Sequence, residues 1–227
     1  MHPQDLIPLL QLSDTSFPAG GFACSWGMEA LVQGGFVHDR RSAQAALAQE
    51  LLGSVGAVEL PAVARARRCL QRGDVEALEH LNALLDGYAP AAASREASRR
   101  MGRRMLQAAL VRFPQLRPAL DTLADAPGGL HHAVAFGAAG GALALPGLAA
   151  VTAYATTWCT QLLLAAARLI PLGQTDVLAA QATLQAPLSA AVQRAERGQV
   201  GRYPSATPLA SVARLLQPWL ERRLFVC

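Results

Sequence analysis

Residues 133–167 read AVAFGAAGGALALPGLAAVTAYATTWCTQLLLAAA, and no charged side chain interrupts them. Pro146 and Gly147 divide the stretch, which predicts two helices, near residues 131–145 and 148–170. Alanine and glycine together outnumber leucine in it. Because apolar residues occur on every side of both helices, we expect two central helices that other helices cover.

The same stretch is also long enough for a membrane hairpin, since a transmembrane helix needs about 20 apolar residues. The break at Pro146-Gly147 argues against a span, and so does a series of polar side chains in the second half (Thr152, Thr156, Thr157, Thr160 and Gln161). Two buried helices of a soluble protein are the preferred interpretation, and a membrane-hairpin protein is the alternative.

The rest of the 227-residue chain favours the same fold class. Hydrophobic residues make up 52% and charged residues 16%, which excludes a disordered chain, and the 46 alanines favour helices over strands. Further helices are expected from a Ser42 cap through Leu52, from Pro61 to near Gly73, from an Asp74 cap to Gly87, and over 90–113, 115–124, 174–196 and 207–222. No segment alternates with period two. We therefore expect one all-α domain over residues 1–227, a bundle of about eight to ten helices with alanine- and glycine-rich central helices, in which Gly137 and Gly141 allow close helix packing.

Charge and cysteine content exclude several functions. All 20 basic residues are arginine, so P-loop, Schiff-base and kinase-type lysine chemistry is excluded. A net charge of +4 is too weak by itself to predict nucleic-acid binding, although a basic helical nucleic-acid binder is a second alternative. The widely spaced cysteines (Cys24, Cys69, Cys159 and Cys227) indicate neither a zinc site nor a disulfide framework, and we expect free buried thiols in a cytoplasmic protein without a signal peptide.

No catalytic constellation assembles from the sequence. Residues 23–27, ACSWG, are similar to a nucleophile elbow around Ser25, but the turn before them is not the strand that this motif requires. A role for Ser25 as a helix cap is the simpler interpretation. His131 and His132 are adjacent, so they point about 100° apart on a helix and cannot easily bind one metal ion. We expect no enzyme activity and no metal site.

An arginine-rich segment is the strongest charged feature. Arg95, Arg99 and Arg103 share one helix face, and Arg100 and Arg104 share another. This segment is expected to contact an acidic partner protein or phosphates, or to be an ordinary solvated helix face.

Residues 16–30, SFPAGGFACSWGMEA, resemble the opening signature of the UreF family of urease accessory proteins, P-x-G-x-F-x-x-S-x-G-x-E. The matching residues are Pro18, Gly20, Phe22, Ser25, Gly27 and Glu29. Weaker similarities follow in order over nearly the whole chain: Arg95-Glu96-Ala97-Ser98, His132 with Phe136 and Gly137, Pro171-Leu172-Gly173-Gln174, and Arg223-Leu224-Phe225. The chain departs from the family pattern at Cys24, usually tyrosine, and at Leu215-Leu216 and Val226-Cys227 in the tail.

The resemblance implies an all-α, dimeric, non-catalytic adaptor. Such a protein bridges a UreD/UreH-type scaffold protein and the UreG-type GTPase, regulates GTP hydrolysis, and assists nickel delivery to apo-urease. It would hold no cofactor of its own, bind neither nucleic acid nor membrane, and use residues 203–227 as a partner-binding tail.

Partner contacts are expected at six residues: Glu29, Arg95, Arg99, Arg103, Gln174 and Arg223. The glycines of the signature let the backbone turn tightly and place Glu29 near a helix start. There the carboxylate could meet a partner arginine or a passing nickel ion, or simply satisfy nearby backbone donors. Gln174 is an interface residue or merely opens its helix.

Overall fold

The computed structural model describes residues 2–89, 91–197, 200–201 and 207–227, and all regular structure in these residues is helical. The α-helices are, in chain order, α1 (Pro3–Ser13), α2 (Met28–Gln33), α3 (Arg40–Leu52), α4 (Leu60–Gln71), α5 (Val75–Tyr88), α6 (Ala92–Arg112), α7 (Arg117–Ala124), α8 (His132–Ala142), α9 (Gly147–Leu169), α10 (Gln174–Arg197) and α11 (Pro208–Leu216). Short turns of 3₁₀ helix are η1 (Gly21–Ala23), η3 (Pro114–Leu116) and η4 (Gln217–Trp219), and η2 (Val55–Glu59) is a π-helical turn. The predicted all-α class is confirmed.

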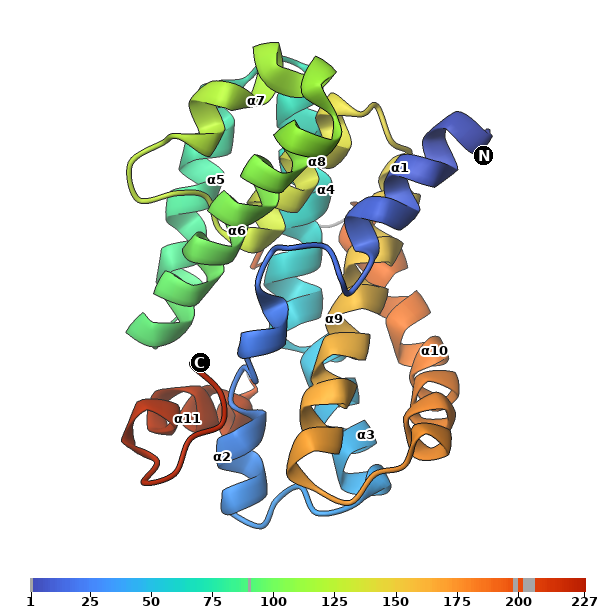
Figure 1. Cartoon of the computed structure of the whole chain (residues 1–227), viewed down its shortest axis with the longest axis vertical. Helices are drawn as coiled ribbons and strands as arrows, with labels where there is room; N and C mark the ends of the chain where they lie inside the picture. The colour runs from blue at the N-terminus through green and yellow to red at the C-terminus, as the bar shows by residue number, and fades with distance from the viewer. Residues whose placement is uncertain (1, 90, 198–199, 202–206) are drawn as a thin grey trace.

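Helix α4 runs through the centre of the bundle, with α5 to α8 towards one end and α3, α9 and α10 towards the other (Figure 1). Helix α8 packs along α4 and against α6. A Cβ atom on Gly137 would collide with the Val63 carbonyl oxygen, and one on Gly141 would lie 2.6 Å from the Arg67 carbonyl oxygen. The predicted close approach of helices at these two glycines is confirmed, because only hydrogen fits between the two backbones.

The expectation that both central helices are covered on all sides holds for α8 and is wrong for α9. One face of α9 is in the core, but Thr152 and Thr156 on its other face are exposed. Their hydroxyls donate to the carbonyl oxygens of Leu148 and Thr152, four residues earlier, at 2.7 and 2.9 Å. Because the helix itself satisfies these hydroxyls, the threonine face needs no protein partner.

The membrane-hairpin alternative does not fit these two helices. Helix α9 alone, among the described residues, is long and apolar enough to cross a membrane. Half of its most apolar 18-residue stretch is, however, buried inside the bundle. Helix α8 has 11 residues, about half of what a span requires. Helix α8 is a buried core helix, and α9 packs one face into the core.

Several helix ends follow the predicted punctuation and others do not. Gly87, predicted to end its helix, lies inside α5, which continues to Tyr88, and the helix predicted to reach residue 145 ends at Ala142. Asp74 caps α5 as expected, its carboxylate accepting from the Ala77 amide at 3.0 Å. Ser42 does not cap α3. Asp39 is the cap, and its carboxylate accepts from the Ser42 amide, while the Ser42 hydroxyl at the third helical position accepts from the Asp39 amide; together they make a capping box. The last predicted helix, 207–222, ends at Leu216, since Pro218 has no amide hydrogen to continue it.

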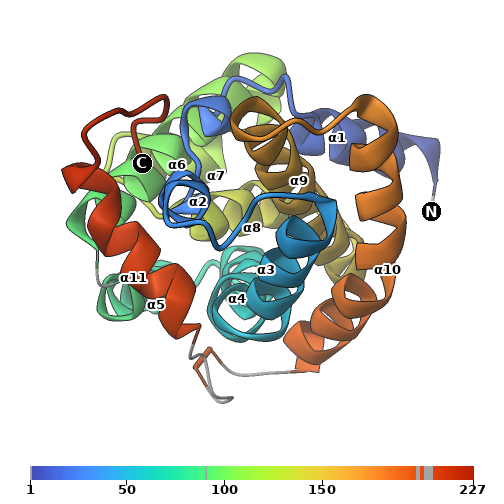
Figure 2. The same cartoon turned by 90° about the horizontal axis from the view of Figure 1, so that it is seen from below.

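The chain end returns to its beginning. Seen from below, α11 lies beside α2, and the C-terminus turns back towards α6 (Figure 2). Residues 207–227, here called the tail, thereby pack against residues 18–29, here called the signature loop. Residues 203–206 of the predicted partner-binding tail lie outside the described residues.

Candidate functional site

The signature loop turns sharply through left-handed backbone. Gly20 has φ +88° and Gly27 has φ +90°, and Trp26 between them also has a positive φ, +53°. At Gly27 a Cβ would lie 3.0 Å from the Arg214 amide nitrogen of the tail. The predicted role of these glycines as turn formers is confirmed, and Gly27 also allows α11 to approach.

Glu29 receives the tail. Its side chain is 2% exposed, in the first turn of α2. One carboxylate oxygen accepts from the Leu224 amide at 2.6 Å, and the other accepts from the Gln217 side-chain amide at 2.7 Å and from the Phe225 amide at 3.2 Å. Of the roles considered for Glu29, the structure shows satisfaction of backbone donors, those of the tail. A contact with a partner or with nickel stays a prediction.

Ser25 and Gln217 complete the polar core of this contact. The Ser25 hydroxyl donates to the Cys227 carbonyl oxygen at 3.0 Å, and the amides of Ser25 and Trp26 donate to the same oxygen at 2.6 and 3.2 Å. Gln217, 2% exposed, holds Glu29 and lies 3.5 Å from the Ser25 hydroxyl. Ser25 caps no helix, contrary to the simpler expectation, because its hydroxyl is used by the tail.

Two further interactions fasten the tail. The Arg168 guanidinium of α9 lies 4.2 Å from the ring centre of Phe22 and 4.4 Å from that of Phe225, and it donates to the Phe22 carbonyl oxygen. The Arg214 side chain of α11 donates to Glu50 of α3 at 2.8 Å and to the Trp26 carbonyl oxygen at 3.2 Å. Both partners of the Arg214–Glu50 ion pair are largely buried, so the loss of either would leave an uncompensated charge.

A disulfide joins Cys24 of the signature loop to Cys227 of the tail. The expectation of four free thiols is therefore wrong for this pair and holds for Cys69 and Cys159, which are free and buried. The two cysteines are 203 residues apart, and no sequence motif predicts that they pair. The pairing follows from the return of the tail to the signature loop, which brings the two residues within disulfide distance.

The outer surface of the tail is apolar. Its exposed hydrophobic side chains are Leu209, Val212, Leu215, Leu216, Trp219, Leu224 and Val226. Trp219 is 83% exposed. Phe22 of the signature loop is 70% exposed, and its ring contacts the same Arg168 guanidinium as the ring of Phe225 in the tail. Large apolar residues gathered in one short segment are typical of a protein-binding surface. Arg223, a predicted contact residue, is also exposed in this segment.

The arginine helix divides into tied and exposed residues. Arg99 pairs with Asp86 of α5 and donates to the Gly129 carbonyl oxygen at 2.7 Å. Arg95 donates to the Ala89 carbonyl oxygen at 2.7 Å, whereas the Arg103 side chain is exposed. Of these three, Arg103 is the most available to a partner in this conformation.

Asp86 also binds His131, at 3.0 Å from Nε2, while the Ser98 hydroxyl is 3.1 Å from Nδ1. Hydrogen bonds from Arg99 hold the pKa of Asp86 below its usual value. Burial lowers the pKa of His131, although Asp86 opposes this. A neutral ring that donates from Nε2 and accepts at Nδ1 satisfies this network, in which Ser98 also accepts from the His132 amide at 3.1 Å.

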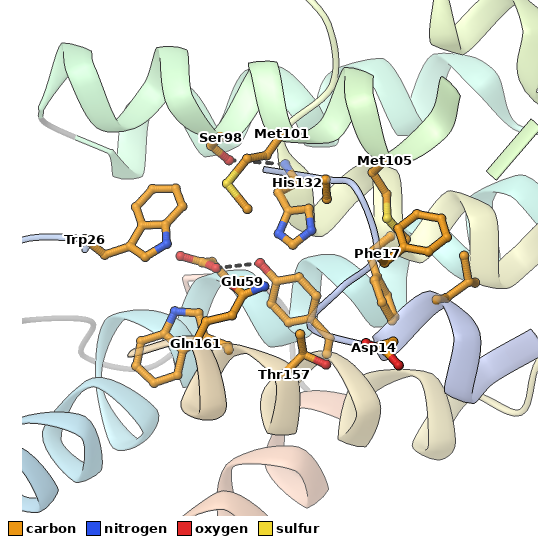
Figure 3. A pocket seen from close by; sticks show the side chains of 15 residues that line it. Asp14, Phe17, Trp26, Glu59, Ser98, Met101, Met105, His132, Thr157 and Gln161 are labelled. Atoms are coloured by element: carbon orange, nitrogen blue, oxygen red, sulfur yellow. Dashed lines mark hydrogen bonds between the residues drawn. The ribbon is translucent and has the colours of Figure 1, made fainter. Parts of the chain in front are cut away.

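A narrow pocket, lined mainly by apolar side chains with a few polar groups, lies between α6 and α9 (Figure 3). His132, Glu59 and Trp26 face it, and the Tyr154 hydroxyl donates to Glu59 at 2.8 Å. Burial raises the pKa of Glu59 and lowers that of His132 to about 4. The cavity is about 20 Å³, room for about one water molecule. This pocket is too small for an organic substrate.

Gln174, the first residue of α10, is exposed, and the structure brings it to none of the other predicted contact residues.

Among the described residues, no three histidine, cysteine or acidic side chains gather as a metal site requires. The sequence analysis missed three residues that fasten the tail: Arg168, Gln217 and Arg214. Their partners are distant in the sequence, and no motif around these residues predicts the contacts.

Comparisons with known proteins agree with the signature. The model of the UreF family matches residues 37–185. A urease accessory protein UreF from Methylobacillus flagellatus is 37% identical over 172 residues, 75% of each chain. The UreF of Methylibium petroleiphilum is 31% identical over 225 residues, 97% of this chain and 93% of its own, so that similarity extends over nearly the whole chain. The chain belongs to the UreF family of urease accessory proteins.

Proposed function

We propose that this chain is a non-catalytic adaptor that bridges a UreD/UreH-type scaffold protein and the UreG-type GTPase. In this role it regulates GTP-dependent insertion of nickel into apo-urease, in the cytoplasm and as a homodimer. Nickel is the cargo of the assembly, and the chain holds no stable cofactor. Membership of an accessory-protein family supports the role, and the observation that carries it is the apolar outer surface of the tail, held in place by buried contacts.

The tail supports this proposal because its buried and exposed sides are chemically different. The inner side is fixed by Glu29, Arg214 and Arg168, so the segment does not need the partner to order it. The outer side presents Trp219 and neighbouring leucines to solvent. A rigid apolar surface binds a partner with little loss of conformational entropy. We assign the scaffold protein to this surface.

The exposed part of the arginine helix supports a second contact. Arg103 is exposed and makes one long hydrogen bond, to the Ala126 carbonyl oxygen at 3.4 Å, whereas Arg99 pairs with Asp86 and donates to the turn before α8. A GTPase with an acidic patch would be attracted to Arg103 and its neighbours Arg100 and Arg104, most strongly at low salt. Arg95 and Arg99 would then act by keeping the helix in place.

The first experiment is size-exclusion chromatography with light scattering. The purified chain is run alone, with the scaffold protein, and with the scaffold protein and the GTPase. We expect a dimer that joins a larger complex. A chain that remains separate from both proteins would refute the adaptor role.

The surface assignment is tested with matched variants. Trp219→Ala should weaken scaffold binding about 30-fold, because a central exposed tryptophan typically contributes about 2 kcal/mol or more to an interface. Val111→Ala on α6 is the control, since Val111 is also an exposed apolar residue, 80% accessible, far from the tail in sequence. Equal affinity of both variants and the unaltered chain would refute the assignment.

The charge contact is tested separately. Arg103→Glu should weaken GTPase binding in a salt-dependent way, with Arg117→Glu on α7 as the exposed control. Gln174→Ala and Arg223→Ala test the remaining predicted contacts, and normal binding by either variant would remove that residue from the interface.

A further inference from the structure

We infer that Cys24 and Cys227 form a reversible thiol–disulfide switch that determines whether the end of the tail stays locked on the signature loop. The inference concerns the same surface as the proposed function and depends on that function only for its effect on a partner.

The two cysteines are brought together by contacts that do not need the sulfur–sulfur bond. Their Cα atoms are 4.8 Å apart, within the range that a disulfide spans. The Ser25 amide donates to the Cys227 carbonyl oxygen at 2.6 Å, and the Val226 amide donates to the Ala23 carbonyl oxygen at 2.9 Å. After reduction these hydrogen bonds keep both thiols near each other, so the bond can form again within the molecule.

Access to the disulfide is coupled to opening of the tail. Cys24 and Cys227 are 4% and 3% exposed and form a small apolar cluster with Ala97 and Met101, separate from the main core. An attacking thiolate must reach one of the two sulfurs, which are buried against Ala97 and Met101 of α6 while the tail is closed. Since this cluster is small and the neighbouring side chains Leu224 and Val226 are exposed, the end of the tail is the part expected to open locally.

The other two thiols cannot compete. Cys69 and Cys159 are buried and unpaired, and burial raises the pKa of Cys159 to about 12. Burial keeps both thiols from reaching another sulfur, and the raised pKa also makes Cys159 a poor nucleophile, so exchange is confined to the Cys24–Cys227 pair.

The reaction is a two-electron exchange with a small thiol such as glutathione. Two glutathione thiols give two electrons and two protons to the Cys24–Cys227 bond, through a mixed disulfide, and leave as oxidised glutathione. The reverse reaction uses oxidised glutathione as the oxidant. In a reducing cytoplasm the pair would be mainly open, and oxidation would close it, as disulfides of cytoplasmic proteins generally report redox change.

Closure has a direct consequence for the apolar surface of the tail. In the oxidised chain Cys227 is covalently joined to Cys24, shortly after Leu224 and Phe225, whose amides donate to Glu29. In the reduced chain the hydrogen bonds to Glu29 still dock the last residues, but without the covalent bond these residues open more often, and a partner binds only the closed fraction. We therefore expect oxidation to strengthen scaffold binding, by roughly tenfold, through preorganisation rather than through a new contact.

The test uses the full chain equilibrated in glutathione buffers of increasing oxidised fraction. Alkylation and intact mass measure the thiols, and hydrogen exchange measures the amides of residues 224–226. We expect the pair to convert between two thiols and one disulfide, with exchange at 224–226 at least tenfold faster in the reduced chain and unchanged in α8. Cys227→Ser should reproduce the reduced chain in every buffer, and Cys69→Ser should behave as the unaltered protein.

Two results would overturn the inference: a pair that stays reduced in fully oxidised glutathione, or equal exchange at residues 224–226 in both redox states. Scaffold binding separates this inference from the proposed function. If the tail locks on oxidation but the scaffold protein binds in neither state, the switch stands and the adaptor proposal fails. If the scaffold binds equally well in both states and the tail exchanges equally, the switch fails and the adaptor proposal stands.

Discussion

Replacement of Glu29 by glutamine should release the tail without unfolding the helices. The carboxylate accepts three hydrogen bonds, from the Leu224 and Phe225 amides and from the Gln217 side chain. Glutamine keeps the shape but has one acceptor oxygen, and its NH₂ group would face at least one of these donors.

The size of the effect follows from these bonds. A hydrogen bond to a charged group contributes about 1.5–3 kcal/mol and a neutral one about 1 kcal/mol, so two retained bonds lose about 1 kcal/mol each. The third donor, the Leu224 amide, loses its acceptor and must bond to water instead. This costs about 1 kcal/mol more, a low figure because Leu224 is half exposed. The sum, about 3 kcal/mol, corresponds to a loss of about two orders of magnitude in the docking equilibrium of the tail.

Hydrogen exchange monitored by mass spectrometry, in reducing buffer so that Cys24 and Cys227 do not hold the tail, measures this loss. Amide protection at residues 224–225 should fall about 100-fold in Glu29→Gln, while far-ultraviolet circular dichroism stays unchanged. Glu221→Gln is the matched control, because it makes the same chemical change in the same segment at an exposed position. Protection that falls less than about threefold in Glu29→Gln would refute the clamp, and global unfolding would show that Glu29 supports the whole fold. If Glu29 acts through the tail, the variant should also activate urease poorly.

Three further predictions concern stability. The folded pKa of His132, about 4, lies below its ordinary value of 6.5, so the unfolded chain binds the proton first and stability is lost as the pH falls from about 6.5 to 4. His132→Phe should remove up to about 3 kcal/mol of that loss, seen as a smaller difference between urea unfolding midpoints at pH 7 and pH 4.5. Gly137→Ala should destabilise the protein by about 2–4 kcal/mol, because its Cβ meets the Val63 carbonyl oxygen, and an unchanged melting temperature would contradict the packing of α8 on α4. Gly87→Ala, where a Cβ meets nothing within 4 Å, should instead raise stability by about 0.5–1 kcal/mol in the same melting experiment.

The sequence by itself determined the helical class and much of the helix punctuation. Asp74 caps its helix through an amide three residues away, and Gly137 and Gly141 lie one turn apart on one face, so these signals are complete within a short segment. The turn at Gly20 and Gly27 was predictable for the same reason, since positive φ angles are a local demand that glycine meets. Helix caps, small-residue spacings and tight turns can be predicted from the sequence because each depends only on residues a few positions apart.

Only the tertiary structure decided which residues the signature loop contacts. Glu29 and Leu224 are 195 positions apart, and Cys24 and Cys227 are 203 apart, with no periodicity that links them. The same applies to α9, whose exposed threonine face depends on which helices reach it. Sequence patterns report the preferences of a segment, whereas these contacts depend on where the packed helices carry the two ends of the chain, and that position is set by the sum of all packing interactions in the core.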